Sequence, residues 1–100
     1  MMYKILHTKQ ALKDSQSVKH AGLGSKAKEI EKTVKKDPFE KSQGFERLTR
    51  DLKGACSRRI NRQQRYVYQV LPNSEKLVDE KGVLYEGIVK VISMWTHYHE

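Results

Sequence analysis

The sequence lacks several features that would place it in a familiar class. Cys56 is its only cysteine, so one chain can form neither an internal disulfide nor a cysteine-based metal cluster. No run approaches the roughly 18 apolar residues of a membrane span, and the first ten residues lack the apolar core of a secretion signal. We therefore expect a soluble protein of the reducing cytoplasm that makes no contact with membranes.

Acidic residues are also scarce. The chain of 100 residues has 12 Asp and Glu against 20 Lys and Arg, a formal charge of +8. Such a chain is attracted to polyanions, so nucleic acid is the first partner class to consider. Charge alone is equally compatible with a merely solvated surface. The length suits one domain, which buries roughly 60 to 65% of the surface that its unfolded chain exposes.

The first third of the chain predicts a strand followed by two helices. Residues 1–8 are strand-like, and Thr8 is placed to cap the next helix, which ends near Gly22. Ser25 is the expected cap of a second helix, which ends before Pro38 because proline disfavours helix at the preceding residue. The apolar stripes of this helical pair, 9–37, comprise Ala11, Leu12, Ser15 and Val18 in the first helix and Ala27, Ile30 and Val34 in the second.

After the helices the pattern becomes extended. Residues 45–71 hold two strand-like runs, "GACSRRI" and "RYVYQVL", joined by a polar "NRQQ" that is typical of a hairpin connection. Residues 72–85 form a polar excursion, either a loop or a hairpin, and 86–98 supply the longest strand. The order predicts one α+β domain over 1–100, in which the N-terminal strand and two helices pack on a twisted antiparallel sheet.

The arginines are concentrated, whereas the fourteen lysines are spread along the chain. All six arginines fall within nineteen residues. Guanidinium groups form planar, bidentate hydrogen bonds to phosphate, while ammonium groups act as hydrated point charges. The segment therefore predicts a surface that grips phosphodiesters, although two or three of its arginines could simply cover a sheet edge. The six are Arg47, Arg50, Arg58, Arg59, Arg62 and Arg65.

These strands also carry a family resemblance. The stretch "DPFEKSQGFERLTRDLKGACSRRINRQQRYVYQV", together with the closing "MWTHY", resembles the Txe/YoeB family of toxins from bacterial toxin–antitoxin modules, within the RelE/ParE superfamily. The resemblance is close over residues 38–70 and again at the last strand, and weaker over the N-terminal strand and helices. It implies a RelE/ParE-like fold related to microbial RNases.

The resemblance implies an endoribonuclease that cleaves messenger RNA in the ribosomal A site through a 2′,3′-cyclic phosphate. It assigns Glu46 as general base, Arg65 as the phosphate-stabilising arginine, His97 as general acid and Tyr98 as the terminal tyrosine of the site. A base, an acid and a cation suffice for transesterification, so we expect no metal and no other cofactor. The phosphate-binding arginines are then Arg50, Arg58, Arg59 and Arg62.

The same resemblance implies the partners. They are the message and the 70S ribosome with its rRNA, and an antitoxin of the YefM/Phd/Axe type with an acidic, partly disordered tail. Operator DNA would be contacted only through the complex with antitoxin. A homodimer stays open, as do the codon preference and the role of the 72–85 excursion.

Other interpretations remain at this point. The chain could be a ParE-like toxin that inhibits gyrase, a non-catalytic RNA-binding protein, or a degenerate copy without activity. Glu46 could be an ordinary surface carboxylate, and His97 could pair with His99 in a weak metal site that lacks a third ligand. The remaining candidates are better interpreted as core: Cys56, Tyr66, Tyr68, Met94 and Trp95.

Overall fold

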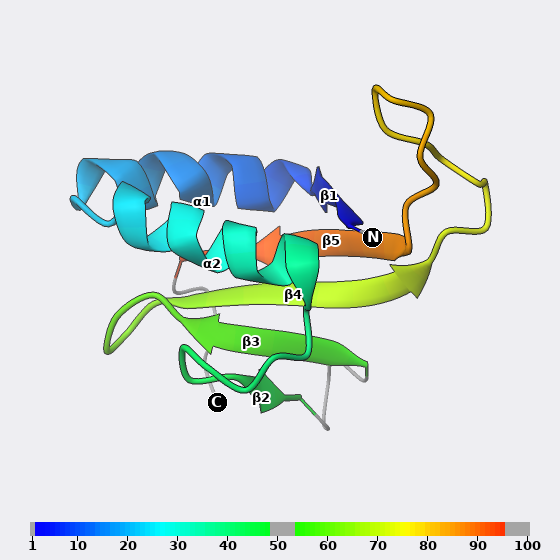
Figure 1. Ribbon diagram of the computed structural model, residues 1–100. Coiled ribbons are helices and arrows are strands. Elements are labelled where there is room, and N and C mark those ends of the chain that lie inside the picture. The colour runs from blue at the N-terminus through cyan, green and yellow to red at the C-terminus, as the bar shows by residue number, and fades with distance from the viewer. Residues whose placement is uncertain (1, 49–53, 96–100) are drawn as a thin grey trace.

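The computed structural model describes residues 2–48 and 54–95. It contains two helices and one five-stranded sheet whose strand order is β1-β5-β4-β3-β2, with both helices on one face of the sheet (Figure 1). The strands are β1 (Tyr3–His7), β2 (Glu46–Arg47), β3 (Ala55–Arg59), β4 (Arg65–Pro72) and β5 (Gly87–Ser93), and the helices are α1 (Lys9–His20) and α2 (Gly24–Lys36). This confirms the predicted α+β class.

The sheet is mixed rather than wholly antiparallel, which corrects one detail of the prediction. The pairs β2–β3, β3–β4 and β4–β5 are antiparallel. Strand β1 lies parallel to β5, from Tyr3 opposite Gly87 to His7 opposite Val91. The connection between β1 and β5 runs through both helices and the other three strands, residues 8–86. Parallel neighbours require such a long connection.

Helix α1 begins and ends where the sequence predicts. The Thr8 hydroxyl oxygen accepts the Ala11 N–H at 3.0 Å, as an N-cap should. At the other end Gly22 has φ +76°, and the Leu23 N–H reaches the Val18 carbonyl at 2.9 Å, which completes a Schellman motif.

Two details of the helices differ from the prediction. The buried stripe of α1 is Ala11, Asp14 and Val18, whereas Leu12 is 55% exposed because it lies about 100° round the helix from Ala11. Helix α2 begins after Leu23 without a side-chain cap, so Ser25 lies inside the helix instead of capping it. The predicted ending before Pro38 is confirmed, since Asp37 is the extended C-cap residue.

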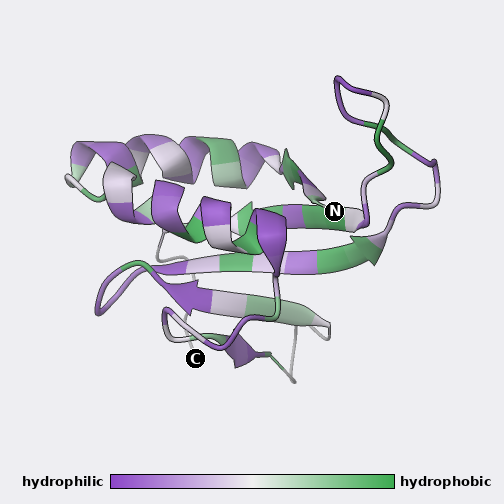
Figure 2. Ribbon diagram, in the orientation of Figure 1, coloured by the Kyte–Doolittle hydropathy of each residue, from purple (hydrophilic) through white to green (hydrophobic). Residues whose placement is uncertain are grey.

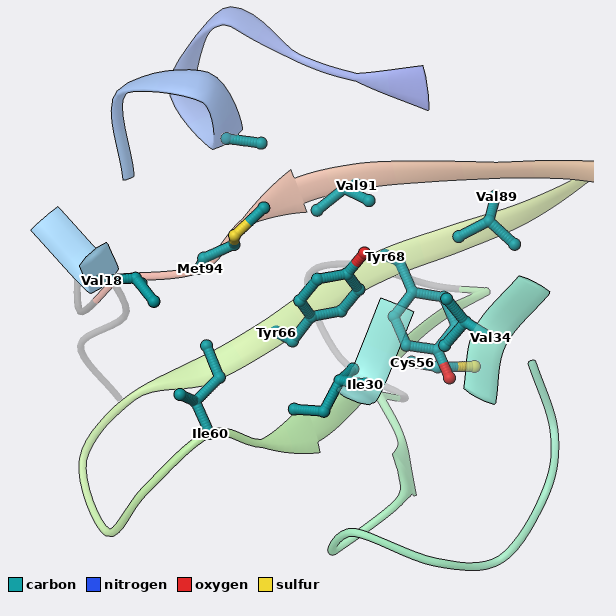
Figure 3. Close-up of a cluster of buried hydrophobic side chains, with 11 residues drawn as sticks. Val18, Ile30, Val34, Cys56, Ile60, Tyr66, Tyr68, Val89, Val91 and Met94 are labelled. Atoms are coloured by element: carbon teal, nitrogen blue, oxygen red, sulfur yellow. The ribbon is translucent and has the colours of Figure 1, made fainter. Parts of the chain in front are cut away.

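The core lies between the helices and the sheet. Ile30 and Val34 of α2 meet Val89 and Val91 of β5 and the two tyrosines of β4 (Figure 3). The Tyr66 and Tyr68 rings pack edge to face, with centroids 5.9 Å apart. Such a contact adds about 0.5 to 1.5 kcal/mol beyond burial. Met94 and Cys56 are buried here and Trp95 packs against the cluster, so their assignment to the core is confirmed.

An ordered arm links β4 to β5 and projects beyond the end of the sheet (Figure 1). We call residues 73–86 the arm. At its base, the Asn73 side chain donates to the Leu77 and Tyr85 carbonyls, both at 3.0 Å, and accepts the Leu77 N–H at 2.9 Å. Near its tip, the Asp79 carboxylate accepts two backbone N–H groups. Four large aliphatic side chains of the arm are exposed: Leu77, Val78, Val83 and Leu84.

Hydropathy follows this architecture. Hydrophilic residues run along both helices, and hydrophobic residues are frequent in the central strands (Figure 2). In the part of the chain that the structure describes, neither helix has the length and apolar character needed to cross a bilayer.

Candidate active site on the second face of the sheet

Strand alternation separates the core residues from the candidate site. Successive side chains of a strand point to opposite faces. In β3 and β4, Cys56, Tyr66 and Tyr68 face the helices. Ser57 and Arg65 therefore point to the opposite side of the sheet, away from the helices, which we call the second face. Glu46 of β2 lies opposite Ser57, which places its side chain on this face as well.

Glu46 and Arg65 meet on this face. The Arg65 Nη2 lies 3.4 Å from the Glu46 Oε1, although the two residues are nineteen positions apart. Their side chains are partly open to solvent, at 58% exposed for Glu46 and 31% for Arg65. The pair therefore combines an accessible carboxylate, able to accept a proton, with a guanidinium beside it that can bind an anionic oxygen.

Two neutral groups orient Arg65. Its Nη1 donates to the buried Ser57 hydroxyl oxygen at 3.2 Å and to the Gly44 carbonyl at 3.4 Å. Ser57 was not among the predicted site residues. The strand pattern could have indicated it, because residues two positions apart in a strand share a face, and Ser57 therefore shares the face of Arg59 and Arg65.

Arg59 extends the positive surface next to this pair. It lies opposite Arg65 in the β3–β4 register, and its side chain is exposed. Its backbone N–H donates to the Gln43 carbonyl at 2.7 Å. Gly44 permits this close approach, because its φ is +66° and a Cβ there would lie 3.0 Å from the Cβ of Arg59. Arg59 is thus held beside Arg65 and is available to a phosphate.

Arg62 is exposed on the connection between β3 and β4. The Asn61 side chain accepts the N–H groups of Gln63 and Gln64 at 2.9 and 2.7 Å, which shapes this turn. Arg62 therefore has the exposure that phosphate binding requires.

Arg58 corrects the predicted set of phosphate-binding arginines. Its side chain points to the helix side and is 0% exposed. The guanidinium donates to the Tyr68 hydroxyl at 3.0 Å and to the carbonyls of Glu40 and Ser42 at 2.7 and 2.9 Å. It also lies 5.0 Å from the centre of the Phe45 ring. No surface of Arg58 is left for an RNA phosphate, and its role is to hold the segment before β2 against the sheet.

The two core tyrosines are held neutral. Burial raises the pKa of Tyr68 to about 12, against a smaller lowering effect of its hydrogen bond from Arg58. Burial also raises the pKa of Tyr66 far above its usual value, with a further contribution from Glu31. Neither phenol can serve as a base near neutral pH.

Three predicted site residues, Arg50, His97 and Tyr98, lie outside the described residues. The structure thus brings together Glu46, Arg65 and Arg59, and leaves the assigned general acid as a prediction. Within 2–48 and 54–95, no three His, Cys, Asp or Glu side chains lie close enough to hold a metal ion.

Comparison with known proteins indicates the family of this chain. A family model for YoeB-like toxins of bacterial type II toxin–antitoxin systems matches residues 7–98. A YoeB/ParE toxin from Agrobacterium tumefaciens is 25% identical with a TM-score of 0.75, covering 95% of this chain and 99% of its own. No curated protein matches the sequence.

Two structures from Staphylococcus aureus are also similar. A YoeB dimer is 26% identical with a TM-score of 0.69, and a heterotetrameric YoeB–YefM toxin–antitoxin complex is 26% identical with a TM-score of 0.68. In both cases the alignment covers 96% of this chain and 98% of the other. With the family model matching nearly the whole sequence, this chain belongs to the YoeB-like toxins of bacterial type II toxin–antitoxin systems.

Proposed function

We propose that this toxin is an endoribonuclease that cleaves messenger RNA in the A site of the 70S ribosome. The observation that carries the proposal is the 3.4 Å contact between the partly exposed side chains of Glu46 and Arg65, with Arg59 beside them. A carboxylate and a guanidinium in contact can act on the same phosphodiester, one on the nucleophile and one on the phosphoryl oxygens.

In the proposed reaction, Glu46 removes the proton of a ribose 2′-hydroxyl. The 2′-oxygen then forms a bond to the adjacent phosphorus, and the bond from phosphorus to the 5′-oxygen breaks. Arg65 stabilises the charge on the non-bridging oxygens, and His97 donates a proton to the departing 5′-oxygen. The products are a 2′,3′-cyclic phosphate and a free 5′-hydroxyl, with Tyr98 completing the site. Arg59, Arg62 and Arg50 are proposed to bind flanking phosphates.

The proposal extends to partners and compartment. Because a relative from Staphylococcus aureus forms a complex with YefM, we propose a YefM-type antitoxin for this chain as well. That relative also forms a dimer, which supports a homodimer here. Operator DNA would be bound through the antitoxin complex, and the cytoplasm is the compartment that contains ribosomes and message.

Primer extension on messages from induced cells tests the activity. The unsubstituted chain should produce new 5′ ends within translated codons. Glu46→Gln and His97→Gln should each lower cleavage by about 10²- to 10⁴-fold, since each removes one acid–base group. The matched controls Glu75→Gln and His20→Gln change exposed groups outside the site and should leave cleavage unchanged.

Cleavage that persists in Glu46→Gln would contradict the proposed base. No new 5′ ends at all, together with inhibited DNA supercoiling, would instead support the ParE-like alternative. RNA binding without either effect would indicate a non-catalytic protein.

A further inference from the structure

A cavity of about 550 Å³ lies where α1 and α2 meet the sheet. Small-molecule sites in proteins typically have volumes of about 300 to 1,000 Å³. The cavity is lined by residues of both helices, together with His7 of β1, Tyr66 of β4 and Met94. Its described lining residues include neither Glu46 nor Arg65, which lie on the second face. This cavity is therefore separate from the proposed cleavage site.

One end of the cavity is formed by the N-terminus of α2. Gly24 and Ser25 line it, and α2 begins after Leu23 with no side-chain cap and no acidic residue in its first turn. The first N–H groups of a helix have no partner within the helix, and the helix dipole places partial positive charge there. Lys19 and Lys28 line the same cavity, are exposed, and form no ion pair with any described residue. This end is suited to a phosphate group.

Deeper in the cavity, towards the sheet, lies a polar group without a partner. Tyr66 is 1% exposed, and its hydroxyl forms no hydrogen bond with any described residue. A buried, unpaired hydroxyl is unfavourable, and an acceptor that reached it would restore the missing hydrogen bond. Met94 belongs to the same core cluster and lines the same cavity, and its thioether side chain is flexible enough to move aside for a ligand.

A hydrogen-bond acceptor accompanies this donor. Glu31 also lines the cavity, and its charge contributes to the raised pKa of Tyr66, although the two side chains form no hydrogen bond with each other. Glu31 follows Gly24 by seven residues of α2, which is about 10 Å along the helix axis. Val18 and Ala27 supply apolar lining. The cavity thus offers a phosphate site at one end, apolar walls, and a donor beside an acceptor at the other end.

A nucleotide has the matching arrangement of groups. Its phosphate lies at one end, and its base carries hydrogen-bond donors and acceptors side by side along one edge. We propose that this cavity binds a nucleoside monophosphate, with the phosphate between Lys19, Lys28 and the first N–H groups of α2, and with the edge of the base at Tyr66 and Glu31. Binding here goes beyond the proposed cleavage of messenger RNA and does not depend on it.

Isothermal titration calorimetry of the full-length toxin tests the proposal. The probes are AMP, CMP, GMP and UMP, compared with inorganic phosphate and with the matching nucleosides. At least one nucleotide should bind about tenfold more tightly than phosphate or its own nucleoside, because only the nucleotide fills both ends. Lys19→Gln combined with Lys28→Gln should weaken binding of that nucleotide about tenfold. Tyr66→Phe should weaken it about 3- to 10-fold and leave phosphate binding unchanged.

Two controls separate this cavity from general attraction to a basic protein. Lys9→Gln combined with Lys13→Gln removes two exposed charges of α1 that do not line the cavity, and Arg59→Gln removes one charge from the second face. Both should leave nucleotide affinity within about twofold of the unsubstituted toxin. If either control weakens binding as much as the Lys19 and Lys28 substitutions do, the nucleotide binds elsewhere and the proposal is wrong.

Equal affinities for nucleotide and inorganic phosphate would also overturn the proposal, as would a lack of binding by all four nucleotides or an unchanged affinity in Tyr66→Phe. These measurements need neither ribosomes nor cleavage. Loss of the proposed nuclease activity and loss of nucleotide binding are therefore distinguishable results.

Discussion

Ser57 shows how a small neutral residue can determine the direction of a charged one. Arg65 has a long, rotatable side chain, and among the residues that the structure describes, Ser57, Gly44 and Glu46 hold its guanidinium by hydrogen bonds. The Ser57 hydroxyl is buried beneath it, so this contact is protected from competing water. Support of this kind is what keeps a reacting group near its productive geometry.

We expect Ser57→Ala to lower message cleavage about tenfold and to lower the free energy of unfolding by about 1.5 kcal/mol, because the partly exposed Arg65 can turn to water. A hydrogen bond to a charged group contributes about 1.5 to 3 kcal/mol, and alanine fits the vacated space. Single-turnover cleavage on ribosomes measures the first effect and urea denaturation the second. The control Ser74→Ala, on the exposed arm, should change neither. A Ser57→Ala variant with full activity would show that Arg65 needs no such support.

Loss of the hydroxyl group should have different effects on the free energy of unfolding at Tyr66 and at Tyr68. The Tyr68 hydroxyl donates to the Pro38 carbonyl at 2.6 Å and accepts from Arg58. The Tyr66 hydroxyl is buried, and no described residue forms a hydrogen bond with it. We expect Tyr68→Phe to lower the free energy of unfolding by about 1 to 3 kcal/mol, and Tyr66→Phe to leave it unchanged or raise it by up to about 1 kcal/mol. Denaturation of both variants in urea checks the contrast.

At the scale of elements, Arg58 joins the segment before β2 to the sheet. Its guanidinium reaches three backbone carbonyls of residues 38–42, which no regular strand or helix holds. Because Glu46 follows this segment by four residues, the position of its carboxylate depends on the buried Arg58.

Arg58→Ala should therefore cost about 3 kcal/mol or more of stability, because it leaves buried carbonyls unpaired. Arg62→Ala, on the exposed turn, should stay within about 0.5 kcal/mol of the unsubstituted chain. Thermal or urea unfolding measures both. Equal, small losses in the two variants would mean that Arg58 is not a structural residue.

The arm should open independently of the core. Asn73 makes three hydrogen bonds at its base, and their loss should raise the population of open arm about tenfold or more. Asn73→Ala should thus speed tryptic cleavage after Lys76 and Lys81 by a similar factor, while urea unfolding of the core changes by less than about 1 kcal/mol. Glu75→Ala serves as the control on the same arm. An unchanged rate of tryptic cleavage in Asn73→Ala would show that the β-bridge between Val78 and Leu84 is enough to keep the arm closed.

Sequence patterns predicted local features of these elements well and long-range contacts poorly. Thr8, Gly22 and Pro38 act within a few residues of themselves, so their effects on the helices could be foreseen. The burial of Arg58 was also foreseeable, because alternation puts it on the face of Cys56, but its charge favoured a surface interpretation. The carboxylate of Asp14 reaches residues 80 positions away, and a single sequence contains no signal for that contact.

The parallel pairing of β1 with β5 was not predicted, because it is also a long-range contact. Nothing within residues 3–7 indicates which strand will be its neighbour, and a pairing with β5 closes nearly the whole chain into one loop. The family resemblance supplied Glu46 and Arg65 as site residues, and their contact through the β2–β3–β4 register is what the structure adds.

At the scale of the whole molecule, charge is unevenly distributed between the arm and the rest of the chain. The arm has four acidic side chains against two lysines, a net charge of −2, so the rest of the chain carries +10. The arm is therefore unsuited to RNA phosphates, whereas the exposed arginines of the β3–β4 region are suited to them.

The logarithm of the RNA association constant should fall linearly with the logarithm of salt concentration, because each phosphate contact releases counterions. In a Glu46→Gln background, in which we expect cleavage to be slow, Arg59→Gln should reduce the slope for single-stranded RNA by about 0.7. Lys76→Gln removes the same charge from the arm and should leave the slope unchanged. Fluorescence anisotropy with a labelled oligonucleotide at several salt concentrations measures both, and equal slopes would place the RNA elsewhere.

The pairing of β1 with β5 also bears on how the toxin is made. Of the five described strands, β5 is synthesised last. In the described sheet, β5 is the one neighbour of β1 and one of the two neighbours of β4. Until β5 has emerged, the nascent chain can form its helices and its β3–β4 hairpin, but β1 has no partner. The sheet is therefore completed only after nearly the whole chain has been synthesised, and β1 stays unpaired in the nascent chain until then.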